Sequence, residues 1–235
     1  MPRIFTIEGN IGSGKSTFVQ KLSEQTDGET IIFLQEPVKT WQGIQDKNGV
    51  SILQKFYEDQ ERYGFTFQMM AYISRLALLK ETVEKNPHAN IITERSLFTD
   101  RYVFAQMLYD SGKIQDIEYT IYLKWFDTFV REYPIYGVIY LRTSPEICFE
   151  RVEKRARSGE STVSLEYLTM CNNYHEKWLK NEKHMCTLNA SSNIYEEGVF
   201  DDWFGKVVKF IHTVPNRRGN PALQYASKYH YTNCI

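Results

Sequence analysis

The chain has 235 residues, and its 28 basic and 29 acidic side chains leave a formal net charge of −1. Proteins that hold nucleic acid polymers by neutralising many phosphates are strongly basic, so this charge argues against that class. No apolar run reaches the roughly 18 residues that a membrane span needs, so we expect no membrane association. Any anion that this protein binds must therefore be held locally.

The cysteines and the first residues indicate the compartment. Four cysteines are scattered along the chain, at Cys148, Cys171, Cys186 and Cys234. Their spacing argues against a disulfide framework and against a zinc site. The N-terminal residues enter a strand-like pattern directly, with the features of neither a signal peptide nor a transit segment. We therefore expect a reducing, cytoplasmic environment.

Short β-branched runs predict strands in chain order at Arg3–Glu8, Thr30–Leu34, Asn90–Thr93, Gly137–Leu141 and Met185–Leu188. Long segments of helical periodicity separate them. This alternation predicts an α/β fold in which helices cover both faces of a five-stranded parallel sheet. Residues 1–214 are expected to form one domain. Residues 215–235 lose apolar periodicity, which predicts a tail that is flexible or lies on the surface.

Two of the predicted helices have clear local signals. A long helix after the second strand carries apolar residues at three-and-four spacing, namely Phe65, Met69, Tyr72, Ile73, Leu76 and Leu79, which predict its buried face. After the fourth strand, Ser144, Pro145 and Glu146 form an N-cap, a first-turn proline and an acid that matches the helix dipole. A second helix is therefore predicted to begin there.

A phosphate-binding motif follows the first strand. Gly9 to Ser16 match G-x-x-x-x-G-K-[ST] between a strand and a helix that begins near Lys15. The residues predicted to hold the phosphates are Gly9, Asn10, Ile11, Gly12, Ser13, Gly14, Lys15, Ser16 and Thr17. Glycines let backbone amides wrap the β- and γ-phosphates, Lys15 adds charge and Ser16 offers a ligand to Mg²⁺. The motif predicts a bound nucleoside triphosphate without separating kinases from GTPases or motor ATPases.

Charged residues follow the strands at the sheet edge where ligands gather in such folds. Glu36 follows the second strand, where a carboxylate is either a general base or an ordinary turn acid. Glu94 is placed to hold Mg²⁺, and Arg95 to stabilise the transferred phosphoryl group. The helix after the fourth strand carries Arg151, Arg155 and Arg157, which predict either a phosphate-clamping lid or a solvated face.

Several segments together resemble one family. The segments are IEGNIGSGKST, QEPVKTW, FTFQ, TERSLFTDRYVF and YLRTSPEICFERVEKRAR. They resemble, in order and from about Arg3 to Leu179, the deoxycytidine, deoxyguanosine and mitochondrial thymidine kinase group of deoxyribonucleoside kinases. The resemblance implies a P-loop kinase fold with an arginine-rich lid. It also implies a homodimer that uses ATP and Mg²⁺ to phosphorylate the 5′-hydroxyl of a deoxynucleoside in nucleotide salvage.

The resemblance implies roles for individual residues. Glu36 would be the base, with Arg95 beside it, while Tyr57 and Glu160 would meet the sugar 3′-hydroxyl. The nucleobase would lie among Trp41, Phe67 and Phe104, with Gln68 on its hydrogen-bonding edge. An amide suits that edge because it offers both a donor and an acceptor.

Two charged residues predict which base is preferred. Arg75 follows Gln68 by two helical turns and so can face the same pocket, and Asp100 follows the third strand. Both match residues of the deoxycytidine- and purine-preferring members. Asp100 could accept from an exocyclic amine but would face O4 of thymine unfavourably. We expect deoxycytidine and purine deoxynucleosides over thymidine; the alternative is an ordinary ion pair on a helix surface.

The chain departs from the family pattern in two places. Gly12 stands where members commonly have alanine, a change that could loosen the loop without altering its chemistry. Gly159 replaces one of two adjacent acids in the lid, which weakens the assignment of Glu160. The loop that binds the ATP base is expected near Asn189–Asn193.

Three other functions compete. A nucleoside monophosphate kinase of the thymidylate kinase type shares the P-loop, sheet and arginine lid, but Glu36 is better suited to a neutral hydroxyl. A GTP-dependent switch would be expected to carry an N-K-x-D segment, which the sequence lacks. A small-metabolite kinase would leave the aromatic residues and Gln68 unexplained.

Overall fold

The computed structural model describes residues 2–26, 30–157, 159–160 and 162–215. Apart from Pro215, the predicted tail lies outside these described residues. Among them, no helix combines the length and apolar character that a bilayer crossing needs.

The sheet confirms the predicted α/β architecture. Its parallel strands are β1 (Arg3–Glu8), β2 (Ile31–Leu34), β3 (Asn90–Glu94), β4 (Ile135–Arg142) and β5 (Met185–Asn189), in the order β2-β3-β1-β4-β5. The predicted boundary of β1 is correct, and the other strands differ by one or two residues at an end. The largest difference is at β4, which starts earlier because Ile135 pairs with Ile4 of the central strand.

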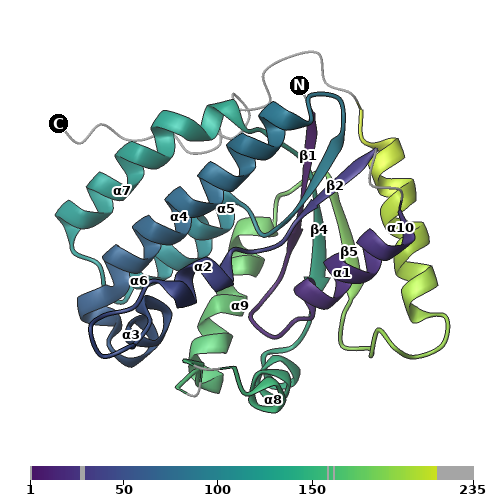
Figure 1. The fold of residues 1–235 in the computed structure, drawn as a ribbon. Helices are drawn as coiled ribbons and strands as arrows, with labels where there is room; N and C mark the ends of the chain where they lie inside the picture. Colours follow the sequence, from purple (N-terminus) through teal and green to yellow (C-terminus); the bar gives the residue numbers. More distant parts are fainter. Residues whose placement is uncertain (1, 27–29, 158, 161, 216–235) are drawn as a thin grey trace.

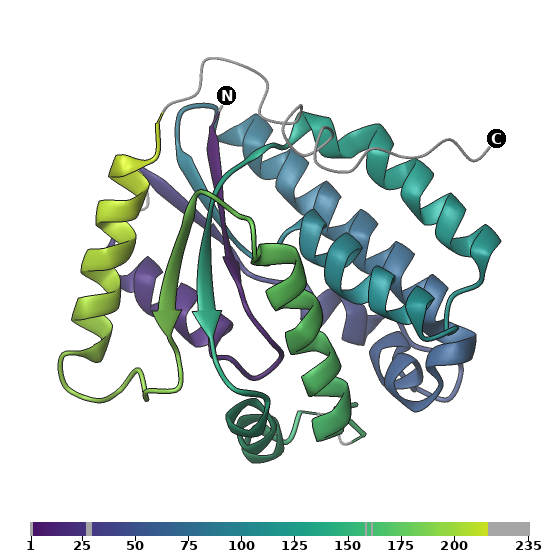
Figure 2. The same cartoon turned by 180° about the vertical axis from the view of Figure 1, so that it is seen from behind.

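Helices cover both faces of this sheet (Figures 1 and 2). The helical elements are α1 (Lys15–Gln25), α2 (Val38–Gly43), α3 (Ile52–Glu58), α4 (Gln60–Lys85), α5 (Leu97–Thr99), the π-helix η1 (Asp100–Ala105), α6 (Gln106–Asp110), α7 (Asp116–Phe129), the 3-10 turn η2 (Val130–Glu132), α8 (Pro145–Arg155), α9 (Leu165–Leu179) and α10 (Val199–Thr213). Helices α1 and α10 pack on one face, whereas α4, α7 and α9 pack on the other.

The two cores follow from the strand period of two, which sends successive side chains to opposite faces. Ile139 and Leu141 of β4 join the cluster under α1 and α10. Val138 and Tyr140 join the cluster of α4, α7 and α9. Because both faces of the sheet are covered, β2 and β4 are apolar along most of their length, as is usual in parallel sheets.

The predicted buried face of α4 is only partly correct. Tyr72 and Leu79 are buried, but Ile73 is 51% exposed. The face that is buried also contains Gln68 and Arg75, two polar residues that an apolar pattern assigns to solvent. Arg75 finds hydrogen-bond partners there in Asp100, Glu94 and Glu36.

The predicted start of α8 is correct. The Ser144 side chain accepts from the amide of Ile147, and Pro145 is the first helical residue. The helix begins directly after β4, so it holds its arginines over the carboxyl end of the sheet. The predicted start of α1 at Lys15 is also correct.

Candidate active site

An open cavity of about 960 Å³ lies at the carboxyl ends of the strands. Its walls come from the loop after β1, the segments after β2, β3 and β5, and helices α3, α4, α8 and α9. The sequence-predicted residues that line it are Ile11, Gly12, Ser13, Gly14, Lys15, Ser16, Thr17, Glu36, Trp41, Tyr57, Phe67, Gln68, Arg75, Glu94, Arg95, Asp100, Phe104, Arg151, Arg155, Arg157 and Glu160. Parts of the chain far apart in sequence therefore share one cavity.

Two predicted phosphate-binding residues have other positions. Gly9 lies outside the cavity wall, packed so tightly that a Cβ there would stand 2.7 Å from Leu141 O and from Ser13 Oγ. Asn10 is not part of the cavity lining, and its side-chain amide donates to Leu168 O of α9 at 2.8 Å. Gly9 allows the close approach of the loop to β4, because a side chain there would collide with Leu141 O. Asn10 anchors the loop to α9 through its hydrogen bond.

The phosphate loop ends at the start of α1. Gly14 has a φ of +94° and caps α1 without a side-chain hydrogen bond, so the first helical amides remain open to the cavity. Exposed helix N-termini of this kind attract phosphate groups. Gly12 has a φ of +81°, and a Cβ there would stand 2.4 Å from Cys148 O. Without a side chain at Gly12 the loop packs directly against α8, and the expected loosening of the loop stays a prediction.

Lys15 is buried beside this loop. Its Nζ donates to Asn10 O at 2.6 Å. Burial lowers the pKa of Lys15 to about 7, and the positive charge of Arg95 acts in the same direction. A bound triphosphate would place negative charge beside Lys15 and so favour its protonated form.

The oxygen ligands predicted for Mg²⁺ lie together. Ser16 Oγ donates to Glu94 Oε1 at 2.7 Å, and Glu94 Oε2 accepts from the amide of Glu36. A hydroxyl beside a carboxylate fits the oxygen preference of Mg²⁺. The described residues form no larger cluster of acidic, cysteine or histidine ligands, so phosphate and water oxygens would have to complete the coordination.

Glu36 is held by two arginines. Arg95 Nη1 lies 2.7 Å from Oε2, and Arg75 Nη2 lies 2.8 Å from Oε1. Burial alone would raise the pKa of Glu36, but the charges of Arg95 and Arg75 outweigh it and hold the pKa at about 2. The carboxylate is therefore ionised at any physiological pH.

Arg95 still has unused donors. Its Nε and Nη2 are buried and have no hydrogen-bond partner among the described residues. The residue adopts a left-handed backbone with φ of +59°, which is uncommon outside glycine. Its guanidinium also lies 5.1 Å from the ring centre of Phe104. These donors are available to an anion or an oxygen entering the cavity.

Arg75 and Asp100 form a buried ion pair. The alternative interpretation, an ordinary ion pair on a helix surface, is therefore wrong. Arg75 Nε lies 2.9 Å from Asp100 Oδ2, and the two side chains are 7% and 2% exposed. Nearby, Gln68 Oε1 is buried without a partner in the described chain. An unpaired buried acceptor is costly, so a ligand with a donor fits here.

Aromatic rings line the deep part of the cavity. The rings of Trp41 and Phe67 meet edge to face at 5.5 Å. Phe67 also stacks on Phe56, with 4.4 Å between the ring centres. Phe56 lines the cavity and was not among the residues predicted from the sequence. Apolar spacing in α3 signals that Phe56 is buried but not what it faces. A second missed residue is Tyr167 of α9, whose buried hydroxyl has no partner among the described residues.

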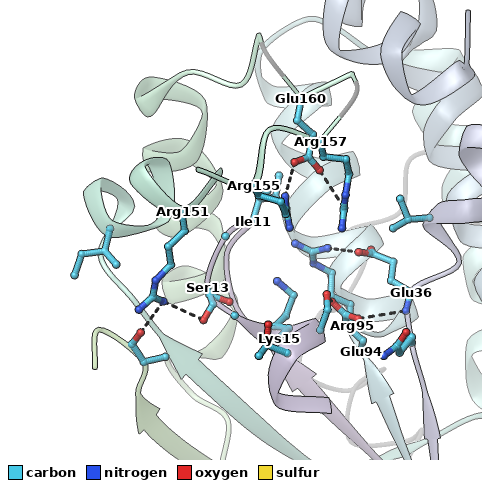
Figure 3. Close-up of a pocket in the computed structure, with 18 of the residues that line it drawn as sticks. Ile11, Ser13, Lys15, Glu36, Glu94, Arg95, Arg151, Arg155, Arg157 and Glu160 are labelled. Carbon is cyan, nitrogen blue, oxygen red and sulfur yellow. Dashed lines mark hydrogen bonds and ion pairs between the residues drawn. The ribbon is translucent and has the colours of Figure 1, made fainter. Parts of the chain in front are cut away.

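The three arginines of α8 and the lid have different partners (Figure 3). Arg155 and Arg157 both bind Glu160, the latter at 3.1 Å. Arg151 instead donates to Ala190 O at 2.8 Å and to carbonyls of the next two residues. Arg151 also lines the cavity and donates to Ser13 O of the phosphate loop at 3.5 Å, so the phosphate-clamping lid stays a prediction.

The loop after β5 forms the outer wall, where the donor base was expected. Ala190 to Tyr195 line the cavity there. Lys21 Nζ lies 4.7 Å from the ring centre of Tyr195, which is 70% exposed and was not among the predicted site residues.

Comparisons with known proteins point in one direction. A family model described as deoxynucleoside kinase matches residues 5–212. A probable deoxycytidine kinase of Fowlpox virus is 42% identical over 183 residues, covering 76% of this chain and 73% of the relative. The mitochondrial deoxyguanosine kinase of Xenopus laevis is 35% identical, with 80% and 77% covered. The human deoxycytidine kinase is 38% identical, with 74% of each chain covered.

Proposed function

Because the chain belongs to the deoxynucleoside kinase family, we propose that it transfers the γ-phosphoryl group of ATP to the 5′-hydroxyl of a deoxynucleoside in nucleotide salvage. We also propose that it prefers deoxycytidine and purine deoxynucleosides over thymidine. The observation that carries the proposal is the carboxylate of Glu36, fixed by two arginines in the cavity that the phosphate loop lines.

Glu36 would receive the acceptor hydroxyl. A carboxylate with a pKa of about 2 is a weak base, but phosphoryl transfer has a loose transition state in most analyses, and catalysis rests mainly on positioning and charge. The proton leaves most readily once the new P–O bond has begun to form. Glu36 would therefore orient the hydroxyl first and accept its proton afterwards.

The remaining charges would act on the phosphates. The open amides of α1 and the ammonium of Lys15 would hold the β- and γ-phosphates, and the free donors of Arg95 would stabilise the transferred group. Ser16 and Glu94 would hold Mg²⁺, which supplies further positive charge when bound.

A neutral acceptor suits this pocket better than a monophosphate. Arg75 is already bound to Glu36 and Asp100, and the free donors of Arg95 are the ones proposed for the transferred phosphoryl group. A phosphate on the acceptor would need a cation of its own beside this carboxylate and would be repelled by it. This supports a nucleoside as substrate over the thymidylate-kinase alternative.

Base selection would follow from the deep end of the cavity. The Gln68 acceptor and the Asp100 carboxylate would accept from an exocyclic amine, and Trp41 and Phe67 would supply aromatic surface for the ring. Tyr57 and Glu160 line the same cavity and would meet the 3′-hydroxyl.

We further propose a cytoplasmic homodimer. Support for the dimer comes from large apolar side chains left exposed on two neighbouring helices, Ile73 of α4 and Ile117, Ile121 and Trp125 of α7. An apolar surface of this kind favours burial against a second copy. The free thiols of the three described cysteines fit a reducing compartment.

The test replaces Glu36 with glutamine and measures turnover and deoxynucleoside binding separately. Turnover should fall by about 10² or more while binding changes little, as for loss of a catalytic base. Glu61→Gln, on the exposed first turn of α4, serves as the control. Unchanged turnover in Glu36→Gln, or consumption of deoxynucleoside monophosphates in preference to deoxynucleosides, would overturn the proposal.

A further inference from the structure

Glu8, the last residue of β1, is a buried carboxylate outside the cavity wall. Its exposure is 0%. Oε1 accepts from Thr6 Oγ1 at 2.6 Å and from Ser96 Oγ at 2.8 Å, and Oε2 accepts from Thr99 Oγ1 at 2.5 Å. Burial leaves the pKa of Glu8 above its ordinary value, because it outweighs these hydroxyl groups and the charge of Arg95, which lower that pKa.

Two of these hydroxyls belong to the segment after β3. Ser96 follows Arg95, and Thr99 precedes Asp100. The side chains of Ser96 and Thr99 also cap each other's backbone amides, with Ser96 N donating to Thr99 Oγ1 at 3.0 Å. Glu8 therefore binds the immediate neighbours of two cavity residues, the arginine beside Glu36 and the aspartate paired with Arg75.

This segment needs such a restraint. Arg95 has its left-handed φ of +59° there, a conformation that side chains disfavour and that surrounding contacts must hold. One contact is the Arg95 amide, which donates to Ile7 O at 2.9 Å, next to Glu8 on β1. The carboxylate adds a second contact directly after the strained residue.

In the chain, Glu8 directly precedes the phosphate loop. Gly9 follows it and is confined between Leu141 O and Ser13 Oγ. One side chain thus joins the start of the loop to the segment that carries Arg95 and Asp100. Neither Ser96 nor Thr99 lines the main cavity.

We propose that Glu8 is a positioning residue of the phosphoryl-transfer reaction, which fixes Arg95 and Asp100 relative to the phosphate loop through Ser96 and Thr99. The inference rests on the proposed function and adds a residue that does not touch substrate. Its effect should appear in the chemical step, because a small misplacement of a transfer arginine alters the reacting geometry more than ground-state binding.

The test compares hydrogen bonds to the same carboxylate. Ser96→Ala and Glu8→Ala remove the link to the segment after β3, whereas Thr6→Val removes a bond to Glu8 within β1 and serves as the matched control. We expect kcat to fall by about 10- to 100-fold in the first two variants. KM for ATP and for the deoxynucleoside should change by less than about threefold. Thr6→Val should lower the melting temperature but keep kcat within about twofold of the parent.

A conservative variant adds a rescue. Glu8→Gln keeps an oxygen acceptor for Ser96, so its kcat should lie between those of the parent and Glu8→Ala. The proposal would be overturned if Thr6→Val and Ser96→Ala both lost kcat, each in proportion to its loss of melting temperature. A Glu8→Ala protein with parental kcat would do the same. If Glu8→Ala does not fold, Glu8→Gln against Thr6→Val still decides, because Ser96→Ala also removes the cap on the Thr99 amide.

A second readout separates this inference from the proposed function. If the parent protein phosphorylates no deoxynucleoside, the proposed function fails. Amide hydrogen exchange at residues 95–100 would still test Glu8 in the same proteins. Exchange there should speed up in Glu8→Gln and Ser96→Ala but not in Thr6→Val, and equal exchange in all of them would refute the positioning role.

Discussion

Arg75 is bonded directly to Glu36, with Nη2 of the guanidinium 2.8 Å from Oε1 of the carboxylate. The same guanidinium holds Asp100 through Nε. One buried cation therefore connects the aspartate proposed to read the base with the carboxylate proposed for proton transfer. Substitutions at the deep end of the cavity should consequently affect turnover as well as base preference.

Replacing Asp100 with alanine should shift the preference toward thymidine. The substitution removes the acceptor for an exocyclic amine and the charge that O4 of thymine would face, so the thymidine to deoxycytidine ratio of kcat/KM should rise by about 10-fold or more. Steady-state kinetics with all four deoxynucleosides measures it. Asp201→Ala, on an exposed turn of α10, should leave the ratio unchanged. A parental ratio in Asp100→Ala would contradict the assignment.

ATP binding should take up a proton near neutral pH. Lys15 in the free protein has a pKa of about 7, below its ordinary value. It is therefore mostly neutral at about pH 8, whereas a bound triphosphate favours the charged form. Affinity for ATP should fall as pH rises above about 7, and proton uptake should vanish well below it.

Calorimetry in two buffers of different ionisation enthalpy measures this uptake. Lys15→Arg is the informative comparison, because a guanidinium stays protonated and should abolish the uptake whatever its affinity. Buffer-independent heats for the parent protein at about pH 8 would show that Lys15 is already charged before ATP binds.

Gly12→Ala should destabilise the protein and weaken ATP binding. The added Cβ would meet Cys148 O at 2.4 Å and adopt a left-handed φ, so α8 must move. We expect a loss of about 1–3 kcal/mol in unfolding free energy. Gly49→Ala is the matched control, since its φ is +79° but no described atom lies within 4 Å of the new Cβ. Equal losses in the two variants would show that the contact with α8 contributes nothing.

A charge on the exposed face of α7 should dissociate the proposed dimer. Trp125→Glu and Ile121→Glu place a carboxylate on a surface that would be buried between copies, where an unpaired charge is strongly unfavourable. Light scattering after size-exclusion chromatography reports the mass. Leu165→Glu, at the start of α9 and 40% exposed, should leave the mass unchanged. A monomeric parent protein would refute the homodimer.

The sequence alone determined the elements whose signals are local. The β-branched run in Arg3–Glu8 marked β1, the glycine spacing marked the phosphate loop, and Ser144 with Pro145 marked the start of α8. These signals are local because backbone conformation depends on the residues themselves and their near neighbours. In a parallel sheet they also placed Glu36 and Glu94 at one edge.

Only the tertiary structure decided which partner each side chain takes. Arg151 binds carbonyls after β5 while Arg155 binds Glu160, although both lie on one helix. Phe56 faces the cavity while Ile73 faces outward, although both belong to apolar patterns. Such choices depend on distances between segments that are far apart along the chain. Those distances exist only after the sheet and helices have packed, so no local pattern encodes them.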